Sequence, residues 1–392
     1  HIPYNLVLIL VTLILTAYVI TGGLKAVMYT DAFQGCIMFI MMLILLVSTY
    51  SILGGITPAH QALTDMAPLM PAKLQKGGML GWTQGAAFGS PLWLVIYTTI
   101  VYGVGIGVLA QPQLAVRFMT VPSDKSLNRA VLYGGVFILF MTGTAFIVGA
   151  LSNAVFYQYF EKIAIAVGKG DIDKIIPVYI ERIMPAWFAA LFLVAMFAAA
   201  MSTLSSQYHV GGTSLGRDLF EKGLRLSRQR SITLNRAGVF LTIIATLIWA
   251  WVLPASVIAR ATAFFFGLCA AAFLPAYACA LYWKKTTKAG AVTSMVGGFF
   301  ISMFWLLFIH EKEAAAIGLC KALTGQTTLV ASAEAGSWIW LLQWVDPNVV
   351  ALPVSFALII TVSLTTRGYS TDHLHHCWSN FVSAQQTREW RN

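Results

Sequence analysis

Three residues of one apolar stretch have the types and the spacing to bind a monovalent cation. The stretch from Phe197 to Gln207 places two hydroxyl side chains, Ser202 and Thr203, among alanines and other apolar residues. On a helix, Ala199, Ser202 and Thr203 stand at i, i+3 and i+4, so they share one face. A Ser or Thr hydroxyl can bond the carbonyl one turn back and loosen it for another partner. These three hard oxygens are fewer than the roughly six that such cations usually take, so other residues must complete the shell.

The same helix face continues as a polar stripe toward one end of the helix. Ser202, Ser206, His209 and Thr213 follow at i, i+4, i+7 and i+11. A path for a hydrated cation from the membrane midplane to the cytoplasm needs such a stripe, and carboxylates at membrane depth usually face a watery cavity or a partner. We therefore assign Asp31, Ser206 and His209 to a cation exit path. The alternatives are that the hydroxyls only bond backbone and neighbouring helices, and that Asp31 caps its own helix.

Residues 102–113 have the composition of a broken membrane helix. Alternate glycines weaken a helix, and a proline removes one of its hydrogen bonds. Broken helices survive in membranes where the freed backbone lines a cavity, and in transporters that cavity often holds the substrate. The alternative is a glycine packing face with an ordinary proline kink. The predicted substrate-lining residues are Tyr102, Gly103, Gly105, Gly107, Gln111 and Pro112.

Arg260 lies about one turn into a later apolar stretch, at its predicted external end. A guanidinium there could contact an anionic substrate or hold an outer gate closed. It could equally extend to the lipid headgroups, and the sequence leaves the two interpretations open.

The elements that position these residues are membrane-spanning helices. Hydrophobic residues make up 58% of the 392 residues and charged residues 10%, which is typical of a polytopic membrane protein and excludes a soluble one. Each predicted span is long enough to cross a hydrocarbon layer of about 30 Å. The nine predicted spans are residues 4–21, 27–53, 91–118, 131–154, 185–209, 234–253, 256–283, 288–309 and 347–365.

The placement of the +10 net charge predicts orientation and argues against nucleic-acid binding. Lys and Arg gather on one side of the nine-span arrangement, at 117–129, 217–236, 284–288 and after residue 367. This positive-inside pattern predicts a multi-pass protein of the plasma membrane with a cytoplasmic C-terminus, and basic patches that touch anionic lipid. The predicted division is a transmembrane core, 1–366, and a cytoplasmic tail, 367–392.

Sequence motifs of enzymes are missing, so we expect no enzymatic activity and no organic cofactor. There is no Walker loop, no dinucleotide fingerprint and no nucleophile elbow. The five cysteines form neither a disulfide framework nor a metal-binding spacing. His373, His375, His376 and Cys377 lack partner ligands at metal-finger spacing.

Three segments resemble the sodium:solute symporter family, in matching order and spacing: residues 22–34, 110–119 and 198–206. The resemblance covers roughly residues 1–365. It implies an all-α membrane protein with a LeuT-type inverted-repeat bundle of thirteen helices, in which this chain begins at the fifth. The first four helices would be absent, including the unwound one that carries half of the sodium and substrate sites.

The resemblance also implies roles for individual residues. The family's sodium ligands on the equivalent helix match Ala199, Ser202 and Thr203. Its acidic residue for intracellular sodium release matches Asp31, and its substrate-lining broken helix matches 102–113. Where the proline-transporting branch carries a Trp and a Tyr, this chain has Val104 and Val108. The pattern Gln111-Pro112-Gln113 followed by Arg117-Phe118 resembles the pantothenate and monocarboxylate branches more closely.

We therefore expect sodium-coupled symport of a small organic solute that carries a carboxylate, by alternating access. Sodium is the co-transported ion, and the partners are the solute, the lipid bilayer and the missing N-terminal helices of the same protein. The alternatives are a non-transporting sensor or scaffold built on a symporter-like bundle, and a channel. Proton coupling is a further alternative, which the hydroxyl pair and the scarcity of buried carboxylates disfavour.

Overall fold

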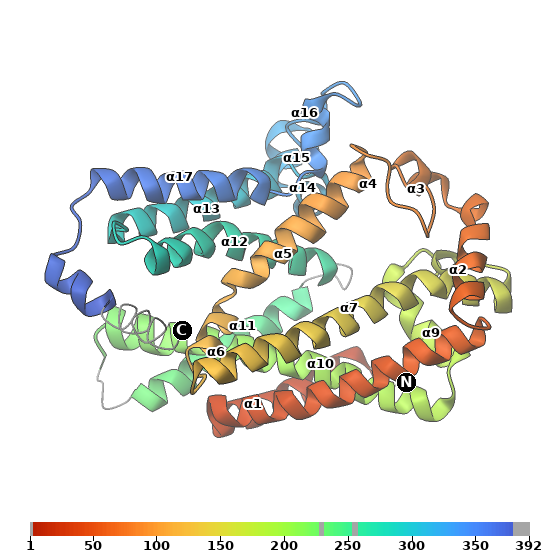
Figure 1. Ribbon diagram of the computed structural model, residues 1–392, viewed down its shortest axis with the longest axis horizontal. Coiled ribbons are helices and arrows are strands. Elements are labelled where there is room, and N and C mark those ends of the chain that lie inside the picture. Colours follow the sequence, from red (N-terminus) through yellow and green to blue (C-terminus); the bar gives the residue numbers. More distant parts are fainter. Residues whose placement is uncertain (1–2, 227–230, 253–257, 379–392) are drawn as a thin grey trace, which may run out of the picture. The chain divides into compact units, whose positions relative to one another are not determined.

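The regular structure of the described part of the protein is almost entirely helical. The computed structural model describes residues 3–226, 231–252 and 258–378, and these contain helices and one isolated β-bridge (Figure 1). The α-helices are α1 Tyr4–Ile52, α2 Ile56–Asp65, α3 Ala72–Lys76, α4 Pro91–Leu94, α5 Gly105–Gly107, α6 Pro112–Phe118, α7 Asp124–Phe160, α8 Ala164–Val167, α9 Ile175–Ile183, α10 Ala186–Thr213, α11 Ser231–Val252, α12 Ile258–Tyr282, α13 Lys288–Phe308, α14 Glu311–Ile317, α15 Leu319–Thr324, α16 Trp338–Leu341 and α17 Asn348–Thr365. The π-helices are η2 Val95–Val104 and η5 Ser214–Gly223, and the 3₁₀ helices are η1 Ala67–Leu69, η3 Val108–Ala110, η4 Ile172–Lys174 and η8 Leu342–Trp344.

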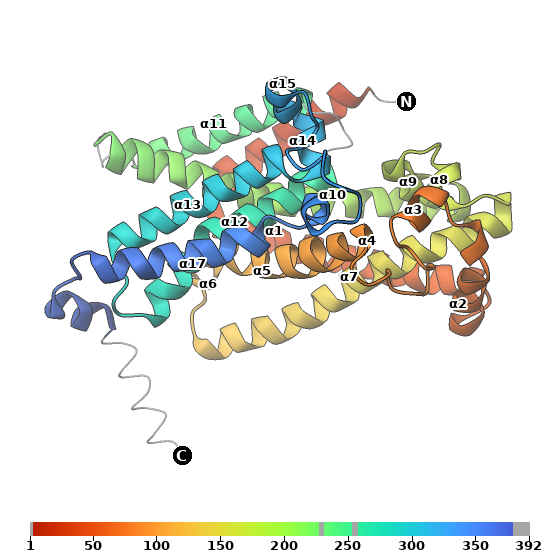
Figure 2. The ribbon, with the colours of Figure 1, turned by 90° about the horizontal axis from the view of Figure 1, so that it is seen from above.

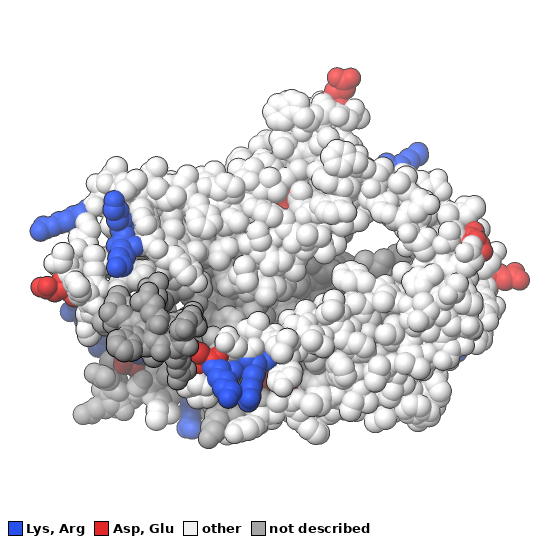
Figure 3. All heavy atoms as spheres, in the orientation of Figure 1, with Lys and Arg blue, Asp and Glu red and all other residues white. Residues whose placement is uncertain are grey.

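Nine helical stretches of the described residues are long and apolar enough to cross a membrane, in agreement with the nine predicted spans. The face of the molecule drawn in Figure 3 carries only a few scattered Lys, Arg, Asp and Glu side chains, and most of this face is uncharged. Many large apolar side chains are exposed, for example Leu13 at 60% and Phe300 at 64%. A lipid environment accounts for such surfaces, because lipid is as apolar as the side chains themselves.

The first two spans form one element, α1, which is interrupted at Gly23. This residue has φ 64° and ψ −175°, a conformation that glycine adopts without steric cost. The spans Asn5–Gly23 and Val27–Ile52 lie on either side of it.

The predicted span 91–118 is wrong at its C-terminal end. The helical run that starts at Pro91 ends at Ala110, and Gln111 is extended with φ −66° and ψ 125°. Pro112 then begins the separate helix α6. The cause is Pro112, because a proline ring disfavours helical backbone at the residue before it and is well tolerated at the start of a helix.

The chain divides into two compact units, each with its own packing. The first comprises residues 1–86 and 115–257, and contains α1, α7, α10 and α11. One of its cores gathers Phe156, Tyr179 and Phe188, each fully buried, and the Tyr179 hydroxyl lies 2.9 Å from the Thr49 hydroxyl.

The second unit comprises residues 87–114 and 258–392, and its α12, α13 and α17 pack closely. Both views show α13 and α17 side by side (Figures 1 and 2). A glycine permits the close approach of α13 to α12: a Cβ added at Gly298 would lie 2.1 Å from the Ala271 carbonyl oxygen. A buried hydrogen bond of 2.8 Å between Ser294 and Ser355 joins α13 to α17.

Candidate functional site

The predicted cation-binding residues lie on one face of α10, in the first unit. The hydroxyls of Ser202 and Thr203 both donate to the Ala199 carbonyl, at 3.0 and 3.1 Å. Because each hydroxyl donates its hydrogen in this bond, the lone pairs of its oxygen remain available to bind a cation. The geometry therefore gathers three oxygens on one face, as the spacing predicts.

A second group of oxygens begins one turn further along α10. The hydroxyls of Ser205 and Ser206 each lie 3.0 Å from the Ser202 carbonyl oxygen. The Ser205 hydroxyl also lies 3.4 Å from Oδ1 of Asp31, and the Ser206 hydroxyl lies 3.5 Å from Oδ2. The helices α1 and α10 pack side by side along this contact. Asp31 and Ser206, two residues of the predicted exit path, are thus brought together next to the Ala199–Thr203 face.

Arg117 completes this group from α6. Its guanidinium donates to the carboxylate of Asp31 and to the hydroxyl of Ser206. The side chains of Arg117 and Asp31 are 31% and 12% exposed, so each supplies the counter-charge that the other needs at membrane depth. The capping alternative for Asp31 does not hold, because Asp31 lies inside α1, more than one turn beyond the break at Gly23.

Neither Arg117 nor Ser205 has a role predicted from the sequence. A signal for Ser205 was present, since it stands at i+3 from Ser202 on the helix. The pairing of Arg117 with Asp31 had no signal, because 86 residues separate them and only the fold brings them together.

The third exit-path residue, His209, lies at i+3 from Ser206. Its ring is mostly buried, and Nε2 has no hydrogen-bond partner. Its carbonyl accepts a bond of 2.9 Å from the Thr213 hydroxyl, which lies one turn further along the stripe.

The residues predicted to line the substrate cavity have different surroundings within the second unit. A Cβ added at Gly103 would lie 2.9 Å from a carboxylate oxygen of Asp346, and one at Gly107 would lie 2.4 Å from the Phe266 carbonyl oxygen. Gly105 has no atom within 4 Å of such a Cβ. The packing alternative therefore accounts for Gly103 and Gly107, whereas Gly105 faces open space.

Of the other residues of this region, Gln111 and Pro112 lie at the break in the helix, and Tyr102 lies before it. Tyr102 is half-buried in η2, and Pro112 begins α6. Gln111 is 6% exposed, and its side-chain oxygen accepts a hydrogen bond of 2.9 Å from Gln113.

Two further predictions concern Arg260 and the histidines of the tail. Arg260 lies in α12, and its side chain is outside the described residues. Within the described ranges, no group of three His, Cys, Asp or Glu side chains has the geometry to hold a metal ion.

Comparisons with known proteins agree with this architecture. The model of the sodium:solute symporter family matches residues 1–298. The chain is 29% identical to the sodium/pantothenate symporter of Haemophilus influenzae, over 76% of this chain and 57% of the relative. It is also 29% identical to the sodium/proline symporter of Staphylococcus aureus, over 82% of this chain and 60% of that relative. The chain thus spans about three fifths of the length of these relatives.

A solved structure of a Na⁺-coupled sialic acid symporter, in a substrate-bound outward-open state, is similar in fold. The TM-score is 0.62 at 17% identity, and the match covers 94% of this chain and 68% of the other. This likeness concerns the fold alone, and it confirms the expected LeuT-type helix bundle.

Proposed function

Because the chain belongs to the sodium:solute symporter family, we propose that the protein couples the inward movement of sodium to the uptake of a small organic solute. The mechanism is alternating access, in which sodium binds the outward-open state more tightly than the inward-open state and so shifts the population between them.

One observation carries this proposal: the Ala199 carbonyl and the hydroxyls of Ser202 and Thr203 lie together on α10. Three neutral oxygens suit a weakly charged hard cation such as sodium. The remaining ligands come from residues outside this face.

The neighbouring group supports a route for release toward the cytoplasm. Sodium that leaves the Ala199–Thr203 face meets the Ser202 carbonyl, the hydroxyls of Ser205 and Ser206, and then the Asp31 carboxylate. In this arrangement the Arg117 guanidinium donates hydrogen bonds to both Asp31 and Ser206. We propose that it competes with the departing ion and holds this end of the route closed, and that His209 lines the next turn.

The names of the relatives support a solute that carries a carboxylate. Pantothenate, proline and sialic acid differ in size and shape, but each is a carboxylic acid. We propose that the solute contacts the 102–113 segment, with Gly105 on the open face, and that Arg260 attracts its negative charge. The proposed orientation has the C-terminus in the cytoplasm, on the basis of the distribution of Lys and Arg.

The test is uptake by the full-length protein reconstituted in liposomes, with a panel of labelled carboxylates and amino acids and a variable sodium gradient. Ser202→Ala and Thr203→Ala each remove one oxygen ligand. Interactions of this kind with a charge are worth about 1.5–3 kcal/mol, so the sodium concentration for half-maximal uptake should rise roughly 10- to 150-fold. Thr361→Ala is the matched control, because Thr361 makes the same bond to the carbonyl one turn back, at 2.7 Å from Ala357, on α17.

Uptake that ignores sodium in the wild type and is unchanged in both variants would refute sodium coupling. Downhill flux without accumulation of solute would support a channel instead. Absence of flux for every solute, in a protein that binds them, would support a sensor.

A further inference from the structure

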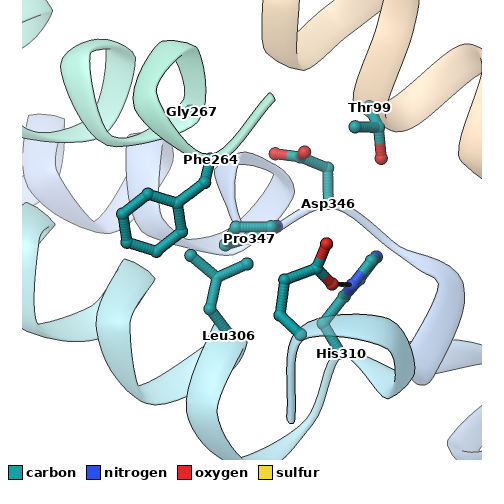
Figure 4. Close-up of a pocket in the computed structure, with 8 residues that line it drawn as sticks. Thr99, Phe264, Gly267, Leu306, His310, Asp346 and Pro347 are labelled. Atoms are coloured by element: carbon teal, nitrogen blue, oxygen red, sulfur yellow. Dashed lines mark hydrogen bonds and ion pairs between the residues drawn. The ribbon is translucent and has the colours of Figure 1, made fainter. Parts of the chain in front are cut away.

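A small cavity in the second unit lies outside the sodium face and collects buried polar groups. Its volume is about 20 Å³, which is room for one water molecule. Figure 4 shows Asp346, Thr99 and His310 reaching it from different elements, with Phe264, Leu306 and Pro347 as its apolar wall. The lining residues are Thr99, Phe264, Gly267, Leu306, His310, Glu313, Asp346 and Pro347.

Two glycines on different helices make room for the carboxylate of Asp346. A Cβ added at Gly103 of η2 would lie 2.9 and 3.1 Å from its two oxygens, and one at Gly267 of α12 would lie 3.8 Å from Oδ1. The backbone N–H of Asn348 donates to Oδ1 at 2.9 Å, and the N–H of Asp346 donates to the Thr98 hydroxyl at 3.0 Å. Asp346 is thereby fixed against η2, and only 4% of it is exposed.

Other polar atoms beside this carboxylate are buried without a partner. Oδ1 and Nδ2 of Asn348, a residue with 0% exposure, have no hydrogen-bond partner. Nε2 of His310, a residue that is 6% exposed, has none either. Buried polar groups of this kind are uncommon in native proteins, and each calls for an explanation such as backbone strain, a bound water or ion, or a functional role.

The charges around the cavity do not balance. His310 attracts the ionised Asp346, but it pairs through Nδ1 with Glu313, and Lys312 acts on Glu313 from the same helix. From η2, Tyr102 interacts electrostatically with Asp346, while α12 and α13 present only Phe264, Gly267 and Leu306. No Lys or Arg is among the lining residues, so the ionised Asp346 is a buried negative charge that shares its positive neighbour, His310, with Glu313.

We propose that Asp346 is a proton-binding site, loaded from the side of the membrane that segment 309–347 faces. A hydronium ion gives its proton to a carboxylate oxygen of Asp346, one O–H bond forms and one water is left, and the charge of the group changes from −1 to 0. The neutral acid no longer needs a counter-ion, and as a donor it can satisfy a neighbouring unpartnered acceptor. Segment 309–347 is then held against the Gly103 face of η2.

Further observations favour a proton over a metal ion. Burial raises the pKa of Asp346 from its usual 3.8 to about 6, within reach of mildly acidic surroundings. Burial also acts against the Glu313 carboxylate, but the hydrogen bond and charge of His310 outweigh it and keep the pKa of Glu313 below its usual value. In the described ranges no metal-binding group of three His, Cys, Asp or Glu side chains exists.

The consequence for transport rests on the proposed function. Gly103 belongs to the segment proposed to contact the solute, so loss of the proton from Asp346 places a charge directly against that segment. Solute uptake should therefore weaken as the external pH rises through about 6.

The first test measures protonation without transport. Infrared difference spectra of the purified full-length protein, labelled with ¹³C-carboxyl aspartate, are recorded between pH 5 and pH 8. We expect the C=O band of one protonated aspartic acid to titrate near pH 6, to carry the isotope shift and to vanish in Asp346→Asn, which has nearly the same shape. Asp65→Asn, at an exposed aspartate of α2, is the control that should keep the band.

Wild-type spectra without such a band would overturn the proposal even if Asp346→Asn does not fold. The absence of any isotope-shifted band that titrates in this range, or its persistence in Asp346→Asn, would overturn the proton site. The second test varies external pH at constant internal pH in proteoliposomes. If the protein takes up no solute at any pH, the proposed function is refuted, but the infrared result on Asp346 still stands. If uptake does not depend on pH although the infrared band titrates, the proposed effect of Asp346 protonation on η2 is refuted.

Discussion

The close contact between Gly107 and Phe266 predicts a large difference between two neighbouring glycines. A Cβ at Gly107 would lie 2.4 Å from the Phe266 carbonyl oxygen, 2.7 Å from its carbon and 2.9 Å from the Phe266 Cβ. Ordinary contact begins at 3.4 Å, so in Gly107→Ala the helices α5 and α12 must separate by about 1 Å. Two of the three atoms belong to backbone, and a side-chain rotation cannot relieve the clash.

Gly105→Ala is the matched control for this substitution. It lies on the same short helix, and its added Cβ meets nothing within 4 Å. Both variants gain the helix propensity of alanine, about 1 kcal/mol. The difference between them therefore isolates the overpacking cost, which we expect to be about 1–3 kcal/mol against Gly107→Ala.

The assay is the free energy of unfolding in detergent, measured for both variants beside the wild type, together with the half-maximal solute concentration for uptake. We expect Gly107→Ala to be less stable than Gly105→Ala. Equal stabilities would refute the packing argument. Equal stabilities with weaker solute affinity in Gly107→Ala would favour the substrate-lining role that the sequence predicts for Gly107.

Two further predictions concern charged groups. The pKa of Asp346 is raised from 3.8 to about 6, so the folded state binds more protons than the unfolded state between these pH values. The free energy of unfolding should therefore fall by about 3 kcal/mol as pH rises from about 4 to 7. Asp346→Asn should remove this pH dependence from the unfolding free energy, and a pH dependence that persists in the variant would contradict the prediction. Arg117→Ala should destabilise by an amount between the roughly 1 kcal/mol of an exposed pair and the 3–5 kcal/mol of a buried one, since Arg117 and Asp31 are 31% and 12% exposed. Adding Asp31→Asn should recover most of that loss, and a double-mutant cycle with no coupling would show that the pair contributes nothing.

Local chemistry explains why part of the site could be predicted. The hydroxyls of Ser202 and Thr203 lie within one helical turn of the Ala199 carbonyl, so the periodicity of the helix alone places the three oxygens on one face. The same reasoning extends to Ser206, and Pro112 marks the break after Gln111. The predicted span across that break was wrong because hydropathy does not register a proline's steric effect on the residue before it.

Contacts between distant segments could not be predicted in this way. Arg117 pairs with Asp31 although 86 residues separate them in the sequence, and Asp346 lies against Gly103 although the two residues belong to different sequence segments of the second unit. In a sequence, Asp346 is only an acidic residue before an apolar span, and Gly103 is only a helix-weakening glycine.

The sequence by itself determined that nine stretches, all within the described residues, are long and apolar enough to cross a membrane, that one helix places three oxygens suited to sodium on one face, and that a further helix is broken. These properties depend on composition and on the 3.6-residue period, which are local. The tertiary structure decided which charge neutralises Asp31, which glycines serve close packing, and which buried carboxylate shares its positive neighbour with a second one. Such questions depend on distances between helices, and only the packed fold sets those distances.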